Sequence, residues 1–292
     1  MRQSQNMGSK GISVKITADS TCDLSREWIE RYGIEIAPLC VVLDGKAYLD
    51  GIEITPDEVF ARAEKSGKIG STAAVNVEDY RALFQKHLKE HDGLVHFTIS
   101  SDMSSCYQNA CVAAGEFENV FVVDSESLST GIGHLVLDAA EMAEQGASAK
   151  EIFDALEEKK KHLDVSFVLN TLAYLRMGGR CSSVAALGAN LLGLKPCIEV
   201  KNGKMGVGKK YRGQLDHCLQ KYVADRLSDA ESVDPRRIFI TDSGVSDEIF
   251  EAVSAEVLRH VPFEQVIHTR AGCTVSNHCG PNCLGILFYR KG

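Results

Sequence analysis

The sequence predicts an α/β protein in two parts, an N-terminal α/β domain over residues 1–163 and a C-terminal α+β domain over residues 164–292. Three observations predict this fold class. The chain has 292 residues, which exceeds the usual size of one domain. In the first half, strands alternate with single helices, as in the βαβ units that build a mainly parallel sheet flanked by helices. In the second half, hairpin-like strands precede alternating strands and helices, which favours a mixed or antiparallel sheet.

The strands of the first domain are expected as short apolar runs, at 12–18, 93–99 and 119–124. Residues 34–54 have the pattern strand, Asp44-Gly45 turn, strand, so we expect a β-hairpin insertion over 33–54. Helices are expected where capping residues precede amphipathic segments. These caps are Ser25, Thr55, Asn76 and Ser148.

The second domain is expected to begin with a strand at 164–170, followed by a short helix that Gly178-Gly179 stops. A helical run follows over 181–193, and Asn202-Gly203 marks a hairpin. The remainder alternates between helix and strand. The expected helices cover 214–228 and 246–261, and the expected strands cover 236–244, 266–272 and 284–292.

The composition argues against several classes of function. The net charge is −8, and the longest basic run, Lys159–Lys161, follows two glutamates. We therefore expect neither nucleic acid nor an anionic membrane surface as the main partner. No run approaches the ~20 apolar residues of a membrane span, so we expect no integral membrane segment. The first eleven residues lack the apolar run of a signal peptide, which predicts a cytoplasmic protein with reduced cysteines.

Cysteines are the natural candidates for a metal site in this chain. Cys273, Cys279 and Cys283 cluster near His278, but no CxxC pair is present and the spacing is poor for zinc. We therefore predict no metal and no cofactor. The cysteines are interpreted as small buried residues and loop thiols.

Hydroxyl side chains gather in the loops that follow the predicted parallel strands. Ligands bind at the carboxyl ends of such strands, and hydroxyl groups together with free N–H groups at helix starts suit a carboxylate or a phosphate. Any single serine could instead be only a helix cap. The candidate residues are Ser71, Thr72, Ser100, Ser101, Ser104 and Ser105.

Two arginines and one histidine could meet such an anion. Gly178-Gly179 would let the chain turn sharply and present Arg180, and Arg212 is a second cationic position. His278 precedes a Cys279-Gly280-Pro281 turn and could act in acid–base chemistry, although each residue could also be an ordinary surface or loop residue. Two alternatives stay open. One is a hydrolase or transferase that uses Ser104, His278 and Asp19, and the other is a binding module for another small anion.

Six segments, in the right order along nearly the whole chain, resemble motifs of the DegV family of bacterial fatty-acid-binding proteins. Residues 16–25 are similar to its D-S-T-x-D-L segment, and residues 276–288 to T-H-x-G-P-G-x-x-G. The other four segments are 70–76 (T-S-Q-P-S), 99–110 (S-S-x-L-S-G-T-Y-Q-x-A), 122–133 (V-D-S-x-x-x-S-x-G-x-G) and 172–203 (L-x-Y-L-x-K-G-G-R-I).

The resemblance implies a binding protein without catalysis of its own. It implies one fatty acid of the C16–C18 class, with its chain in an apolar tunnel between the two domains. It also implies that a separate ATP-dependent fatty acid kinase subunit converts the presented carboxylate into an acyl phosphate. By motif, the carboxylate contacts fall on Ser71 and Ser104, with Thr72 and Ser101 beside them, and a partner-facing rim on Arg180, Arg212 and His278.

The chain departs from the family patterns close to both serines. Ala73, Ala74 and Val75 stand where the family has Q-P-S, Ser105 and Cys106 replace G-T, and Asn282 replaces the last glycine of G-P-G. These departures affect the conformations of the two loops and therefore the preferred length of the fatty acid's acyl chain. Apolar stretches at 134–143 and 184–194 could supply tunnel walls.

Overall fold

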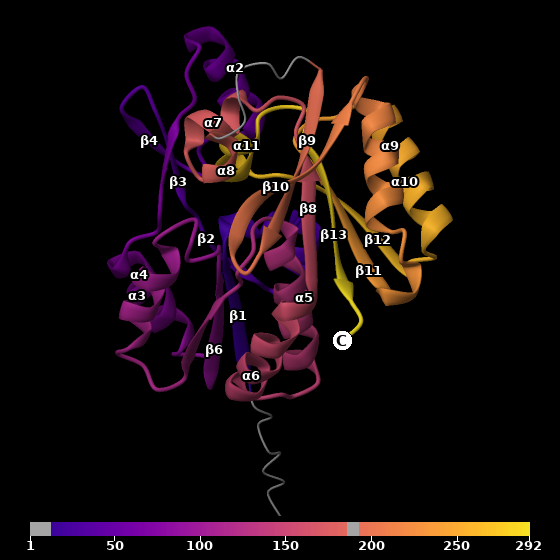
Figure 1. The fold of residues 1–292 in the computed structure, drawn as a ribbon. Coiled ribbons are helices and arrows are strands. Elements are labelled where there is room, and N and C mark those ends of the chain that lie inside the picture. Colours follow the sequence, from indigo (N-terminus) through magenta and orange to yellow (C-terminus); the bar gives the residue numbers. More distant parts are fainter. Residues whose placement is uncertain (1–12, 186–192) are drawn as a thin grey trace, which may run out of the picture.

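The computed structural model describes residues 13–185 and 193–292. Figure 1 shows a parallel sheet in the N-terminal half, a larger sheet in the C-terminal half beside it, and a small third sheet above the first. The expected helical run at 181–193 is described only as α8 (Ser182–Ala185). The rest of that run, most of the tunnel wall expected at 184–194, and residues 1–12 lie outside the described residues.

The N-terminal sheet has four parallel strands in the order β2 (Glu35–Ala37), β1 (Val14–Asp19), β6 (Gly93–Thr98) and β7 (Val120–Asp124). Helices cover both of its faces, as Figure 1 shows. One face carries α3 (Val77–His87) and α4 (Cys106–Ala114), and the other carries α1 (Arg26–Tyr32), α5 (Thr130–Glu144) and α6 (Ala149–Lys159).

The segment that follows β2 forms a separate antiparallel sheet. β3 (Cys40–Leu43) pairs with β4 (Lys46–Leu49) through Asp44-Gly45, whose φ angles of 51° and 79° are those of a tight hairpin turn. A third strand, β5 (Ser71–Ala73), pairs with the other edge of β3, where the sequence indicated only a loop. Between them, α2 (Pro56–Ser66) begins with the expected capping box of Thr55 and Glu58.

The C-terminal sheet has six strands and is mixed, because only β11 and β12 pair in parallel. Its order is β10 (Lys204–Arg212), β9 (Leu194–Lys201), β8 (Leu163–Val168), β13 (Leu284–Arg290), β11 (Val233–Asp242) and β12 (Gln265–Arg270). The helices α9 (Leu215–Arg226) and α10 (Asp247–His260) cover its outer face with a core that includes Tyr222 and Val257. The predicted fold class is therefore confirmed, with a parallel sheet flanked by helices and a mixed sheet in the C-terminal half.

Helix α5 joins the two halves. It packs against β1 and β6 on one side and against β8 and β13 on the other, and every residue from Thr130 to Ala140 is buried. A helix that is apolar on nearly all sides belongs inside a protein. The stretch 134–143, considered above as a tunnel wall, thus packs mainly between the two sheets.

The last helix differs from the sequence expectation. The segment around His278 was expected as a glycine turn, but residues Cys273–Cys279 form helix α11, which ends at Gly280. It contacts α2, β3 and α7 (Ala173–Gly178). Seven residues are too few for a visible apolar period, which explains why the sequence did not indicate this helix.

None of the helices in the described part of the chain is long and apolar enough to cross a bilayer.

Candidate ligand-binding cavity

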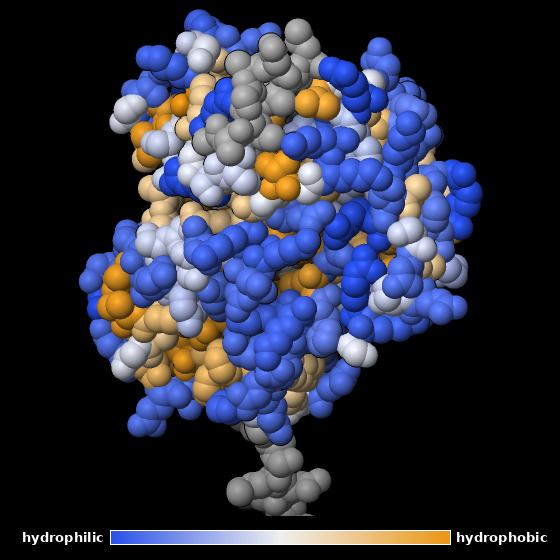
Figure 2. Space-filling view, in the orientation of Figure 1, coloured by the Kyte–Doolittle hydropathy of each residue, from blue (hydrophilic) through white to orange (hydrophobic). Residues whose placement is uncertain are grey.

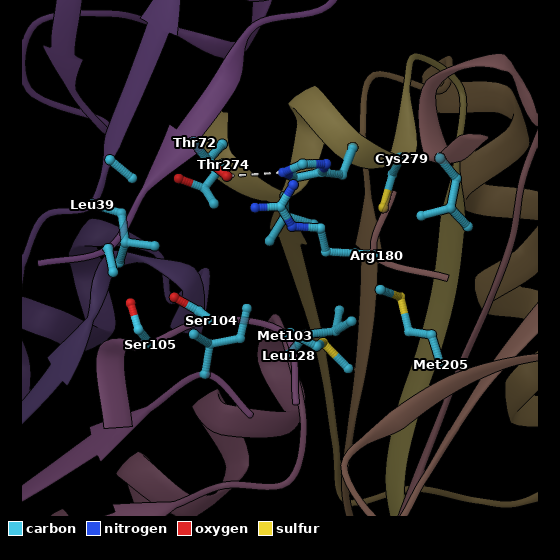
Figure 3. Close-up of a pocket in the computed structure, with 16 residues that line it drawn as sticks. Leu39, Thr72, Met103, Ser104, Ser105, Leu128, Arg180, Met205, Thr274 and Cys279 are labelled. Atoms are coloured by element: carbon cyan, nitrogen blue, oxygen red, sulfur yellow. Dashed lines mark hydrogen bonds between the residues drawn. The ribbon is translucent and has the colours of Figure 1, made fainter. Parts of the chain in front are cut away.

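A cavity of about 150 Å³ opens between the N-terminal and C-terminal halves. Figure 3 shows its lining side chains converging from both sides. One group is apolar and consists of Leu39, Ile99, Met103, Leu128, Leu175, Met205 and Val275. The other group carries hydroxyl or nitrogen groups and consists of Thr72, Ser104, Ser105, Arg180, Thr274 and His278. The cavity thus combines apolar walls with a cluster of hydrogen-bonding groups, as small-molecule sites do.

A second, smaller cavity of about 20 Å³ adjoins the first. Leu128, Val275 and Cys279 line both cavities, so these three side chains lie between them. The second cavity reaches the inner face of the C-terminal sheet at Phe167 and Leu287. Leu128, Val275 and Cys279 therefore separate the polar group in the first cavity from a small void beside the protein core.

Thr72 and His278 meet across the first cavity. Thr72 comes from β5 and His278 from the last turn of α11, and Thr72 Oγ1 lies 3.0 Å from His278 Nε2 (Figure 3). Burial, followed by the positive charge of Arg180, lowers the pKa of His278 to about 4. The imidazole is therefore neutral at pH 7 and shares one hydrogen bond with the threonine hydroxyl.

Buried aspartates of the N-terminal half hold the start of α11. Asp50 accepts hydrogen bonds from the N–H groups of Cys273 (2.8 Å) and Thr274 (3.1 Å). Asp23 accepts one from the N–H of Gly272 (2.9 Å), and burial raises the pKa of Asp23 to about 8. These bonds satisfy N–H groups that a helix start leaves free. Helix α11 is thus a C-terminal segment positioned by the N-terminal half.

Two asparagines hold the segment from Gly70 to Val75, which carries Thr72 into the cavity. Asn277, which is fully buried, accepts a hydrogen bond from the Gly70 N–H (2.9 Å) and donates one to the Gly70 carbonyl (2.8 Å). At the other end, Asn109 donates to the Val75 carbonyl (2.8 Å). The backbone on both sides of Thr72 is therefore fixed by side chains from α11 and α4.

Ser104 lies in the loop between β6 and α4. The N–H groups of Met103 and Ser104 donate to the Ser100 carbonyl at 2.9 and 3.2 Å, which folds the loop back toward the cavity. The Ser104 hydroxyl donates to Cys106 Sγ at 3.2 Å and accepts from the Cys106 N–H at 3.3 Å. The thiol at position 106 thus takes part in fixing the serine.

Arg180 lines the cavity from the turn after α7, although its residue is exposed overall. Its Nη1 donates to the Gly178 carbonyl at 2.8 Å. Gly178 itself lies against His278, and a Cβ on this glycine would lie 2.2 Å from His278 Nδ1. The absence of a side chain at position 178 therefore leaves the room that the imidazole occupies.

Three predicted residues lie away from this cavity. Ser71 is exposed on β5, Ser101 donates its N–H to Asp124 Oδ1 (3.2 Å), and Arg212 is exposed at the end of β10. None of the three belongs to its described lining. The predicted residues that the structure brings together are Thr72, Ser104, Ser105, Arg180 and His278.

The three side chains of the hydrolase alternative, Ser104, His278 and Asp19, are not hydrogen-bonded to one another in the described part of the chain. That alternative is therefore wrong. His278 bonds to Thr72, and Ser104 bonds to Cys106. Asp19 is fully buried and accepts hydrogen bonds from the Tyr80 hydroxyl (2.6 Å) and the Ile99 N–H (3.1 Å). Within the described residues, the Ser104 hydroxyl is hydrogen-bonded to Cys106 and not to a histidine that could act as its base. The described residues also contain no group of three or more His, Cys, Asp or Glu side chains that could hold a metal ion.

Sequence reasoning missed Thr274, Asn277 and Asn109. Thr274 lies outside the six family-like segments, Asn109 occupies an open position of one of them, and the bonding partners of both asparagines are distant in sequence. Asn277 and Gly70 are 207 positions apart. Only the resemblance hinted at position 277, where Asn stands in place of the threonine in T-H-x-G-P-G.

Residues 13–291 match the family model described as "Uncharacterised protein, DegV family". A DegV domain-containing protein of Clostridium acetobutylicum is 32% identical over 280 residues, which cover 95% of this chain and 99% of the relative.

Two solved structures are similar to this chain. A DegV family protein from Thermus thermophilus, described by its fatty acid binding, has a TM-score of 0.89 and 31% identity, and covers 96% of this chain and 100% of its own. A stearic acid-binding protein from Eubacterium ventriosum has a TM-score of 0.82 and 28% identity, with coverage of 95% and 98%.

Proposed function

This chain belongs to the DegV family. We propose that it binds one long-chain fatty acid of the C16–C18 class between its two halves. The carboxylate would lie among the hydroxyl groups of Thr72 and Ser104, and the acyl chain would run along the apolar walls. We also propose that residues 1–163 and 164–292 act as two domains that enclose the ligand. The proposed binding extends to this chain what the Thermus thermophilus and Eubacterium ventriosum relatives are described as doing.

One observation carries this proposal, namely that the cavity between the two halves combines a polar cluster with apolar walls. Each buried methylene contributes about 0.8 kcal/mol, so a long chain can dominate the affinity while the hydroxyl groups orient the head. A pocket lined by polar groups alone would have favoured another anion, but apolar side chains such as Leu128 and Val275 line the first cavity and also a second void beside it.

The size of the first cavity bears on how the chain would enter. An apolar cavity of ~150 Å³ accommodates a molecule such as benzene, and the first cavity has a volume of about 150 Å³. A C16 chain is much longer than benzene. We therefore propose that the chain passes Leu128 and Val275 and widens the second cavity as it enters.

The proposal predicts that purified protein incubated with palmitate gains the mass of one fatty acid in native mass spectrometry. Ser104→Ala and Thr72→Val should weaken binding by about 10- to 150-fold each, because each removes a hydrogen bond to a charged group worth about 1.5–3 kcal/mol. Ser148→Ala is a suitable control, because it removes a helix cap on α6, which lies away from the cavity. A wild-type protein that gains no mass and shows no thermal shift with palmitate or oleate would refute the proposal.

We further propose that a separate ATP-dependent kinase subunit phosphorylates the bound carboxylate. Arg180 supports this proposal, because it lines the cavity while its residue is exposed. In the proposed complex, Arg180 and His278 would face the phosphoryl group, and the outward-facing Arg212 and Ser71 would be available to the partner.

The kinase proposal predicts that palmitate-loaded protein yields acyl phosphate when a fatty acid kinase subunit and ATP are added. Arg212→Ala should lower this rate without changing palmitate binding, since Arg212 lies outside the cavity. The acyl phosphate can be trapped with hydroxylamine as a hydroxamate and counted. An unchanged rate in the variant would remove Arg212 from the proposed rim, and no product from the wild type would refute the kinase step while leaving fatty acid binding untouched.

A further inference from the structure

The hydroxyl group of Thr274 has no hydrogen-bond partner in the described part of the chain. The residue is only 4% exposed and lines the first cavity (Figure 3). Its backbone is fixed, because its N–H donates to Asp50 Oδ2. A buried hydroxyl without a partner costs about 1–3 kcal/mol, and such groups are rare in native proteins. This hydroxyl therefore calls for an explanation.

Three neighbouring polar side chains of the cavity differ from Thr274 in this respect, whereas His278 Nδ1 is likewise buried without a partner among the described residues. Thr72 bonds to His278, Ser104 bonds to Cys106, and Arg180 bonds to the Gly178 carbonyl. A ligand that binds these groups must compete with the bonds already present. The Thr274 hydroxyl, in contrast, can donate its proton to a ligand oxygen without giving up a bond.

Thr274 lies on the head-group side of the cavity. Thr274 and His278 are four residues apart on α11, so they lie on the same face of that helix. His278 in turn bonds to Thr72, the residue on which the proposed carboxylate site rests. Figure 3 shows Thr72 and Thr274 next to each other at the same end of the cavity.

We propose that Thr274 is a third hydroxyl ligand of the fatty acid carboxylate, alongside Thr72 and Ser104. The inference rests on the proposed function and adds a specific residue to it. An ionised carboxylate offers about four acceptor positions and no donor, so it can take hydrogen bonds from all three hydroxyl groups. The apo protein bears the cost of the unpaired hydroxyl, and ligand binding removes that cost.

The inference has a testable signature, because Thr274→Val should change affinity and stability in opposite directions. Valine has nearly the shape of threonine, so the packing of α11 is retained while the unpaired hydroxyl is removed. We expect the affinity for palmitate to fall about tenfold, and the melting temperature of the ligand-free protein to stay unchanged or to rise. Thr274→Ser, which keeps a hydroxyl, should retain most of the affinity.

Thr21 provides a matched control within the same chain. Its hydroxyl is also buried and unpartnered among the described residues, but Thr21 belongs to neither cavity lining. Thr21→Val should therefore leave the affinity for palmitate unchanged. Both variants can be compared with the wild type by competition binding with a fluorescent fatty acid and by thermal melting.

The outcomes separate this inference from the proposed function. If the wild type binds no palmitate, the proposed function fails and no comparison of variants is needed. If the wild type binds palmitate and Thr274→Val binds it equally well, the inference is overturned while the function stands. If Thr274→Val loses stability together with affinity, Thr274 has a structural role, and the inference is again overturned.

Discussion

Replacing Asn277 by alanine is expected to lower the free energy of unfolding by about 2–4 kcal/mol, because it leaves two backbone groups of Gly70 without their partner. The same change should loosen the strand that carries Thr72. We therefore expect palmitate to dissociate at least tenfold faster from this variant. Urea denaturation gives the stability, and stopped-flow displacement of a fluorescent fatty acid gives the dissociation rate.

Two other variants distinguish this effect from general destabilisation. Asn109→Ala removes a single bond, to the Val75 carbonyl at the other end of the same segment, so its effects should have the same sign and be smaller. Ser148→Ala should lower stability without changing the dissociation rate. An Asn277→Ala variant that is less stable but releases palmitate at the wild-type rate would show that the bonds between Asn277 and Gly70 do not affect ligand release.

Replacing Gly178 by alanine is expected to displace His278. The added Cβ would lie 2.2 Å from His278 Nδ1, which is far inside contact distance. Overpacking of this kind typically costs about 1–3 kcal/mol. The displaced imidazole would lose its bond to Thr72 and become more exposed to water. We therefore expect weaker palmitate binding and a pKa of His278 that rises from about 4 toward its ordinary value near ~6.5.

The pKa change gives the Gly178→Ala prediction a readout of its own. In the wild type, the low pKa of His278 means that the unfolded state takes up a proton first as the pH falls below ~6.5. His278 therefore contributes a loss of stability between that pH and its native pKa of about 4. In Gly178→Ala this loss should shrink, and an NMR titration of the ring protons should show the raised pKa directly.

Gly206 offers a control for this substitution. It lies on β10, and a Cβ added there would meet no atom within 4 Å. Gly206→Ala should leave both palmitate binding and the titration of His278 unchanged. If His278 in Gly178→Ala still titrates near pH 4, the imidazole has kept its place and the explanation given for this glycine is wrong.

The sequence predicted those parts of the fold that depend on neighbouring residues. The capping box at Thr55, the turn at Asp44-Gly45 and the hairpin at Asn202-Gly203 are all present where expected. Each is governed by a few adjacent side chains and their φ preferences. The alternation of strands and helices likewise predicted the parallel sheet.

The parts that were missed depend on contacts between distant residues. Strand β5 has three residues and exists through its pairing with β3, and α11 is short and is held by Asp23 and Asp50. Thr72 lines the cavity and Ser71 does not, because successive side chains of a strand point to opposite sides. Sequence motifs identified the right loop, but only the pairing of β5 decides which hydroxyl faces inward.

The surface of the molecule fits a ligand held between its halves. The face shown in Figure 2 is largely hydrophilic, and apolar residues are visible between the part around α7 and the part around α3 and α4. The first cavity lies between the same two halves of the chain.

The anchoring of α11 has a consequence for the order in which the protein becomes functional during synthesis. Domains generally fold from the N-terminus while the chain is still being made. Here the β3–β5 sheet and the buried Asp50 are made early, but the helix they hold begins only at Cys273. The nascent chain would thus expose an unfinished, partly apolar hollow until the residues of α11 have been made. Under the proposed function, a fatty acid could bind only after α11 has been made and has docked on Asp23 and Asp50.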